Sequence, residues 1–130
     1  FDYAKMARFT ERDVGRLLQD AGIVRHRGKI EAVINNAVRA EELIAREGSL
    51  AAFLWGYEPD AKKLAKPQSM TTSAESVALA KELKKRGWKF IGPTTVFAFM
   101  QAMGLVNDHV EGCVTRAEVE RARKKFKPPR

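Results

Sequence analysis

The sequence predicts an all-α protein. Apolar residues recur at helical spacing in several stretches, and glycines close most of those stretches. Hydroxyl and carboxyl residues stand where helix N-caps are expected, and no two stretches alternate as paired strands would. With 130 residues and 45% hydrophobic content, the chain is long enough to bury one core. We therefore expect a single domain over residues 1–130.

Three helices are predicted in the first half of the chain, over residues 11–21, 27–47 and 50–54. Thr10 and Asp13 are spaced as a capping box in front of the first helix. The second is the longest and carries apolar residues at helical spacing throughout. Residues 55–70 lack such periodicity and contain glycine, proline and scattered lysine, so they are expected to form a surface connection.

Three more helices are predicted in the second half. Thr72 and Glu75 are spaced as a capping box for a helix that stops at Gly87. Pro93 suits the first turn of the next helix, which is nearly all apolar and is therefore expected to be buried. Thr115 and Glu118 predict a last, amphipathic helix. The basic C-terminal tail, residues 116–130, carries seven basic side chains against two acidic ones.

The charge of the chain indicates a polyanionic partner. It has 24 basic and 16 acidic residues, a net charge of +8 and a pI near 9.9. Nucleic acid and an anionic membrane surface both fit this charge. No apolar run is long enough to span a bilayer and the N-terminus lacks a secretory signal, so we expect a soluble, cytoplasmic protein. The single cysteine, Cys113, excludes an intrachain disulfide.

Two segments could contact phosphates. The first is the turn from Gly87 to Gly92, followed by a helix that begins with Pro93, Thr94 and Thr95, where free backbone amides and the helix dipole favour an anion. Lys89 lies inside this turn. The second is the run of basic and histidine residues from Arg25 to Lys29. The alternatives are an ordinary tight link between packed helices and a solvated charged face.

His109 and Cys113 stand four residues apart, a workable spacing for two zinc ligands. A tetrahedral site needs four ligands, and the only other imidazole or thiol is His26, so either there is no site or its other ligands lie outside this chain. Cys113 as a nucleophile with His109 as its base is a further alternative. Among the aromatic residues, Phe97 is the best candidate for stacking on a flipped base, although aromatic residues at helical spacing more often belong to the core.

Three blocks of the sequence resemble one family. Residues 19–30, 83–95 and 100–109 are similar to segments of DNA-3-methyladenine glycosylase I, an all-helical enzyme of the helix-hairpin-helix DNA glycosylase superfamily. The likeness runs from Phe1 to about Cys113, with residues 52–70 and the tail unmatched. It corresponds to the C-terminal portion of the family's domain, because the family has an N-terminal segment with no counterpart before Phe1.

The resemblance implies base-excision repair: hydrolysis of the N-glycosidic bond of 3-methyladenine in alkylated double-stranded DNA, by base flipping, in a monomeric protein of the bacterial cytoplasm that acts on nucleoid DNA. It implies no membrane and no organic cofactor. A monofunctional reaction is implied because related lyases carry a Schiff-base lysine where this chain has Thr94. The residue that recognises the alkylated base, a Glu, is expected in the N-terminal segment of the family.

The resemblance also assigns residues of this chain. It implies a structural zinc with His109 and Cys113 as two of four ligands, the other two lying in that N-terminal segment. The base pocket would include Phe97 and Ala98, where some relatives have Tyr and Ser. The residues implied for DNA binding are Arg25, Arg27, Lys29, Lys89, Gly92, Thr94 and Thr95. The alternatives are a non-catalytic helix-hairpin-helix module and a basic adaptor for protein or membrane.

Overall fold

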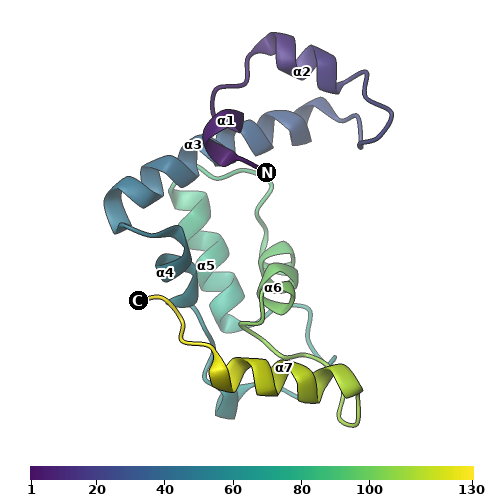
Figure 1. The fold of residues 1–130 in the computed structure, drawn as a ribbon, viewed down its shortest axis with the longest axis vertical. Helices are drawn as coiled ribbons and strands as arrows, with labels where there is room; N and C mark the ends of the chain where they lie inside the picture. Colours follow the sequence, from purple (N-terminus) through teal and green to yellow (C-terminus); the bar gives the residue numbers. More distant parts are fainter. The chain divides into compact units, whose positions relative to one another are not determined.

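The structure, a computed structural model that describes residues 1–130, consists of helices and connections without a strand (Figure 1). The predicted all-α class is confirmed. No helix combines the length and apolar character needed to cross a membrane. The α-helices are α1 (Tyr3–Met6), α2 (Glu11–Leu17), α3 (Arg27–Glu47), α4 (Leu50–Trp55), α5 (Ala74–Lys85), α6 (Pro93–Ala102) and α7 (Val114–Lys125), and Ala61–Lys63 form a 3₁₀ turn.

The chain divides into two compact units that alternate along the sequence. Unit 1 contains residues 1–50 and 83–90, and unit 2 contains residues 51–82 and 91–130. Helix α5 therefore starts in unit 2 and ends in unit 1. We expected one domain from the length of the chain, and length carries no information about such an interleaved division.

Unit 1 is built on helix α3, whose bounds match the predicted range. Its N-cap is His26, whose Nδ1 accepts the backbone N–H of Lys29 at 3.1 Å. It ends at Gly48, whose φ of 80° suits a residue without a side chain. Helices α1 and α2 pack against α3 (Figure 1). Small side chains on the buried side of α3 allow close packing; they are Ala32, Ala37 and Ala40.

Helix α2 begins as predicted but ends earlier. The carboxylate of Asp13 accepts both the N–H and the hydroxyl of Thr10, at 2.9 and 3.1 Å, which confirms the capping box. The prediction that this helix continues to Ala21 was wrong, because it ends at Leu17. The Oδ1 of Asp20 accepts the N–H of Gly22 at 2.8 Å, and such a local side-chain turn competes with helical hydrogen bonding.

Unit 2 has its core along one face of α6. Phe97 and Met100 are buried on that face, whereas Phe99 and Met103 are 37% and 56% exposed. The prediction that the whole helix is buried was therefore wrong for its second face, because average apolarity does not tell which side a neighbour covers. Other buried side chains of unit 2 are Ser76, Leu79, Ala80, Val96, Leu105 and Val106.

Two predicted caps are displaced by one or two residues. Helix α5 starts at Ala74, and its cap is formed by Ser73 and Ser76, each of which accepts the other's backbone N–H on its hydroxyl at 2.8 and 3.1 Å. Thr72 and Glu75 do not form it. Helix α7 starts at Val114 with Cys113 as its N-cap, so Thr115 lies inside the helix. Hydroxyl residues occur in runs here, and the spacing rule alone does not choose among adjacent serines and threonines.

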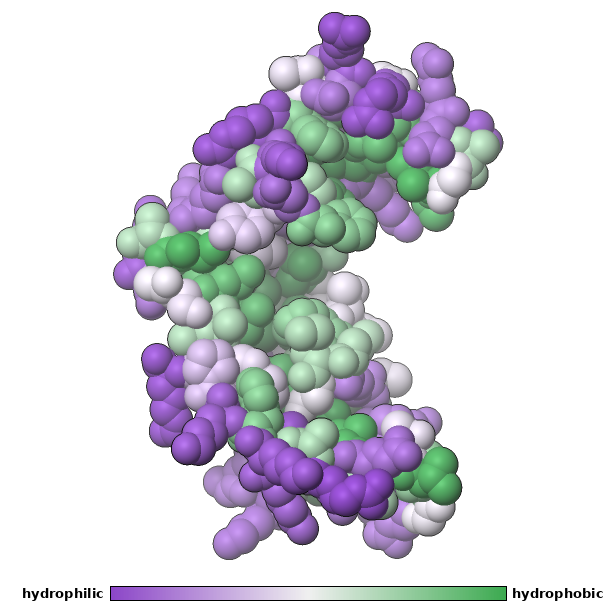
Figure 2. Space-filling view, in the orientation of Figure 1, coloured by the Kyte–Doolittle hydropathy of each residue, from purple (hydrophilic) through white to green (hydrophobic).

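Most of the basic tail belongs to α7, and one of its arginines, Arg123, is half-buried and held by three partners. The guanidinium of Arg123 lies over the ring of Trp55, at 4.7 Å, and over that of Phe126, at 5.4 Å. It also forms an ion pair with Glu58. The remaining surface of α7 is mostly hydrophilic in Figure 2. Arg123 therefore holds the last helix within unit 2 and is not a free cation.

Candidate functional site

In unit 1, two asparagines of α3 hold the first part of the predicted phosphate-binding turn. The side-chain amide of Asn35 donates to the carbonyl of Gly87 at 2.9 Å. Asn36 donates to the carbonyl of Lys89 at 2.9 Å and accepts the N–H of Lys89 at 2.8 Å. Gly87 adopts a φ of 84°, a conformation that favours glycine, as helix α5 ends. The backbone of residues 87–89 is therefore fixed on the middle of α3.

Phe90, the last residue of this part, lies against the basic run. Its ring contacts that of His26 edge to face, with centroids 6.3 Å apart. It is 61% exposed, and its φ of 55° is uncommon for an aromatic residue. A Cβ added at Gly28 would lie 3.1 Å from the His26 ring and 3.8 Å from the Phe90 ring. Unit 1 thus brings the basic run beside residues 87–90, the first part of the predicted phosphate-binding turn.

The basic side chains of this surface are not equivalent. Arg25, Lys29 and Lys89 are exposed, and no ion pair of theirs is found. Arg27 is paired with Glu11 at 2.5 Å and with Glu31 at 3.3 Å. The hydrogen bond that Arg27 donates to the Glu11 carboxylate raises the pKa of the Arg27 guanidinium. Arg27 therefore links α2 to α3, and phosphate contact would compete with this link.

In unit 2, the start of α6 holds the other residues predicted to contact DNA. Gly92 is the N-cap and Pro93 is the first helical residue. Thr94 and Thr95 are exposed. N–H groups in the first turn of a helix have no carbonyl partner within it and lie at the positive end of the helix dipole. The predicted start of α6 at Pro93 is confirmed, whereas phosphate binding at this end stays a prediction.

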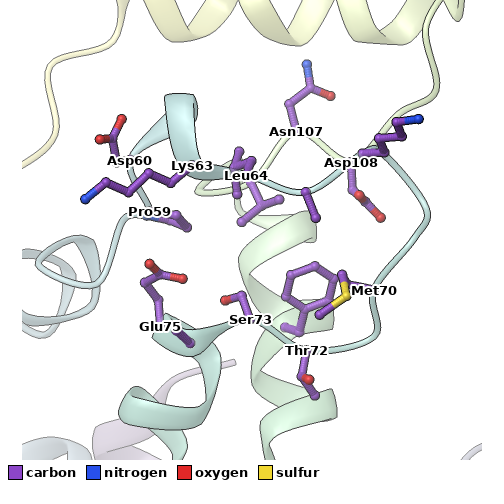
Figure 3. Close-up of a pocket in the computed structure, with 15 residues that line it drawn as sticks. Pro59, Asp60, Lys63, Leu64, Met70, Thr72, Ser73, Glu75, Asn107 and Asp108 are labelled. Atoms are coloured by element: carbon purple, nitrogen blue, oxygen red, sulfur yellow. The ribbon is translucent and has the colours of Figure 1, made fainter.

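Phe97 lines a cavity of about 320 Å³ in unit 2, a size within the range of small-molecule pockets (Figure 3). Met70 and Thr72 come from the connection before α5, and the carboxylate of Glu75 comes from its first turn. Glu75 was predicted only as a cap residue, so its place in a cavity was missed. Ala98 is exposed and does not line this cavity.

His109 lies in a loop that is tied to α7. Asn107 Oδ1 lies 3.0 Å from Nδ1 of the His109 ring, and Asn107 Nδ2 donates to the carbonyl of Arg116 at 3.1 Å. The Arg116 guanidinium donates in turn to the carbonyl of His109 at 2.6 Å. Asp108, between them, accepts the side-chain amide of Gln101 at 2.8 Å. Sequence analysis singled out His109 but missed the residues that fix it.

Cys113, the second predicted ligand, is the N-cap of α7. The backbone N–H groups of Arg116 and then Thr115 lower the pKa of its thiol below the ordinary value. This favours the thiolate, the form that binds metal ions. The structure contains no group of three or more His, Cys, Asp or Glu side chains arranged for a metal ion. That His109 and Cys113 converge on one ion stays a prediction.

Residues 1–117 match the sequence profile of the methyladenine glycosylase family. The chain belongs to this family. The match includes the turn from Gly87 to Gly92, called the hairpin below, as well as the basic run, Phe97, His109 and Cys113. It stops within α7. Methyladenine glycosylase membership thus covers every residue that the sequence analysis assigned to a site.

Relatives of this methyladenine glycosylase chain include curated and structurally characterised proteins. DNA-3-methyladenine glycosylase 1 of Escherichia coli is 45% identical over 117 residues, which are 87% of this chain and 63% of that protein. A crystal structure of a 3-methyladenine DNA glycosylase I matches with a TM-score of 0.77 at 47% identity, over 87% of this chain and 64% of the other. A structure of the Staphylococcus aureus enzyme, solved to explain 3-methyladenine recognition, matches with a TM-score of 0.80 at 35% identity. The match covers 88% of this chain and 63% of the other. The chain spans less than two thirds of each.

Proposed function

We propose that this protein acts in base-excision repair as a DNA glycosylase that hydrolyses the N-glycosidic bond of 3-methyladenine in alkylated double-stranded DNA. The observation that carries the proposal is family membership over residues 1–117. The names of the Escherichia coli and Staphylococcus aureus relatives state this base as the one they act on or recognise. We place the activity in the cytoplasm, with the protein working as a monomer.

The chemistry of the substrate sets modest demands. A 3-methylated adenine is cationic while attached to deoxyribose, so it is a good leaving group and needs little acid catalysis. Water adds to the sugar carbon as the base departs, which leaves an abasic site with the strand intact. Selectivity then depends on extruding the base into a pocket whose aromatic faces favour a positive ring. Phe97 is the residue of this chain that we assign to such a pocket, with Ala98 beside it in sequence.

Affinity for the duplex is expected to come from contacts with its phosphates. From unit 1, Lys89 is presented on a backbone held by Asn36, and Arg25 and Lys29 are exposed in the same unit. From unit 2, Gly92, Thr94 and Thr95 supply the first-turn amides of α6. Arg27 contributes less to phosphate binding, because Glu11 and Glu31 already partly neutralise its charge. Such contacts position the protein without reading sequence.

A structural zinc ion fits the chemistry of the two candidate ligands. His109 has one ring nitrogen engaged by Asn107 and the other without a hydrogen bond, and Cys113 favours its thiolate. These two residues would hold the ion together with two ligands from outside the described residues. Bound there, zinc would supply cross-linking of the fold and no step of the reaction.

The test is release of free 3-methyladenine from a methylated duplex, followed by chromatography. The 130-residue chain is assayed alone and mixed with the part of the Escherichia coli relative that it does not match. We expect release in the mixture, with abasic sites and no strand scission. Duplex binding without release in both assays would favour a non-catalytic DNA-binding module. Failure to prefer DNA over an anionic vesicle would favour a basic adaptor.

A further inference from the structure

The side-chain amide of Asn107 has a defined orientation. Its Nδ2 donates to the carbonyl of Arg116 at 3.1 Å, and a carbonyl can only accept, so the nitrogen must lie on that side. Its Oδ1 therefore faces the His109 ring, 3.0 Å from Nδ1, and also lies 3.4 Å from the His109 N–H. An amide oxygen has no proton to give, so Nδ1 of the ring must be the donor.

We propose that Asn107 is a positioning residue that keeps the neutral His109 ring protonated on Nδ1 and so leaves the lone pair of Nε2 free to bind a metal ion. The hydrogen bond made by one ring nitrogen decides which nitrogen carries the proton. Metal-binding histidines commonly donate their other N–H to a protein oxygen, which fixes both the tautomer and the ring orientation. The metal part rests on the proposed zinc ligation, whereas the tautomer does not.

The other histidine of the chain has the opposite arrangement. Nδ1 of His26 accepts the backbone N–H of Lys29, so its neutral ring carries the proton on Nε2. No lone pair of a neutral His26 is then free. The two imidazoles of this protein are therefore set in different tautomers by their local partners, and His26 serves as an internal reference for His109.

A second contact keeps the ring in place. The Arg116 guanidinium donates to the carbonyl of His109 at 2.6 Å and to that of Asn107 at 3.4 Å. Arg116 lies in the first turn of α7, directly after its N-cap, Cys113. Hydrogen bonds donated from the loop to α7 and from α7 to the loop thus join His109 to the helix whose N-cap is Cys113.

The experiment is a long-range ¹H–¹⁵N NMR correlation on the 130-residue protein, at a pH where both rings are neutral. We expect His109 to show a protonated Nδ1 and an unprotonated Nε2, and His26 to show the reverse. Asn107→Leu removes the acceptor and should move His109 toward the Nε2–H form, with His26 unchanged. Asn107→Asp keeps the acceptor and loses only the donor to Arg116, so it should retain the wild-type tautomer.

A wild-type His109 protonated on Nε2 would overturn the proposal, whether or not the variants fold. So would an Asn107→Leu protein that is folded and keeps its tautomer. Zinc is then added to the wild-type chain mixed with the part of the Escherichia coli relative that it does not match, which is expected to carry the other two ligands. We expect Nε2 of His109 to shift while Nδ1 stays protonated, and the affinity of the same mixture with Asn107→Leu to be about 10- to 100-fold lower. Binding through Nδ1 would contradict the proposal. A His109 in the expected tautomer that ignores zinc would reject the proposed zinc ligation and the metal part of this inference, but leave the tautomer in place.

Discussion

Asn36 forms two hydrogen bonds with the backbone of Lys89, donating to its carbonyl and accepting its N–H, as a neighbouring strand would. The two residues are 53 positions apart. Asparagine is a poor helix former in the middle of a helix. Lys89 lies outside any helix or strand, so its backbone groups have no partner in regular secondary structure. The Asn36 amide takes the place of that partner and holds the turn to which we assign phosphate contact.

Asn36→Ala should lower the free energy of unfolding by about 1–2 kcal/mol, because the Lys89 N–H and carbonyl both lose a partner at the surface. It should also weaken duplex binding. Asn35→Ala is the matched control, since Asn35 makes only one hydrogen bond to the turn. It should lower the free energy of unfolding and duplex binding by less than Asn36→Ala does. Urea unfolding and fluorescence anisotropy measure the two effects. Equal losses in the two variants would contradict the special role of Asn36.

Arg25→Ala and Lys29→Ala should each reduce the salt dependence of duplex binding. Each lost phosphate contact lowers the slope of log K against log salt by about 0.9. Lys62→Ala is the control, an exposed lysine of the 3₁₀ turn in unit 2, and it should leave the slope unchanged. Titrations at several salt concentrations provide the slopes. An unchanged slope in both variants would show that Arg25 and Lys29 do not contact phosphates.

Borohydride should trap no covalent adduct between this protein and alkylated or abasic DNA. Such trapping requires an amine that forms a Schiff base, and the position after the hairpin where related lyases have lysine is Thr94. A lyase-type glycosylase treated in parallel is the positive control. A protein–DNA adduct seen on a denaturing gel would show that another lysine acts as a nucleophile and that the reaction is not monofunctional.

The Asp13 cap should contribute to stability at neutral pH and not in acid. The hydrogen bond that it accepts from the backbone N–H of Thr10 lowers the pKa of its carboxyl below the ordinary value of an aspartate. A folded pKa below the unfolded one stabilises the protein above the unfolded pKa, and this stabilisation disappears as pH falls through the folded pKa. The Tm difference between wild type and Asp13→Asn should therefore narrow from pH 6 toward pH 2. A constant difference would argue against the shift.

Arg123→Ala should loosen helix α7. The substitution removes the contacts with Trp55 and Phe126 and the ion pair with Glu58, at a cost of about 1–2 kcal/mol. Hydrogen exchange of the α7 amides should become faster than in Lys124→Ala, a control at the exposed neighbouring position. Unchanged exchange would show that α7 is held by its other contacts.

Local signals were predicted best. The bounds of α3 and the Thr10–Asp13 cap follow from spacing within a few residues, and both are confirmed. The apolar pattern of the sequence also predicts seven core residues. Of these, Ile30, Leu83, Val96 and Met100 are buried, whereas Leu17, Ile34 and Ile91 are only partly buried. Periodicity identifies the apolar side of a helix, but how completely it is covered depends on neighbours distant in the sequence.

The candidate site shows the same limit. The hairpin, the basic run, Phe97, His109 and Cys113 were singled out from residue type and resemblance. Asn36 and Asn107 were not singled out. The partner of Asn36 lies 53 residues away, and Asn107 acts through contacts within a loop and with the next helix, which spacing along the sequence does not reveal. Two consecutive asparagines in the middle of the longest helix were the one available signal, since a helix rarely places them there without a use for their amides.

The interleaving of the two units has a consequence for synthesis on the ribosome. Residues 1–50 emerge before residues 83–90, which unit 1 also needs and which follow only after the whole 51–82 stretch. Until then the amides of Asn35 and Asn36 have only water and each other as partners, and closing the unit requires an excursion of 32 residues to return. Unit 1 can therefore close only once residues 83–90 have emerged, and at that time residues 91–130 of unit 2 are still to come.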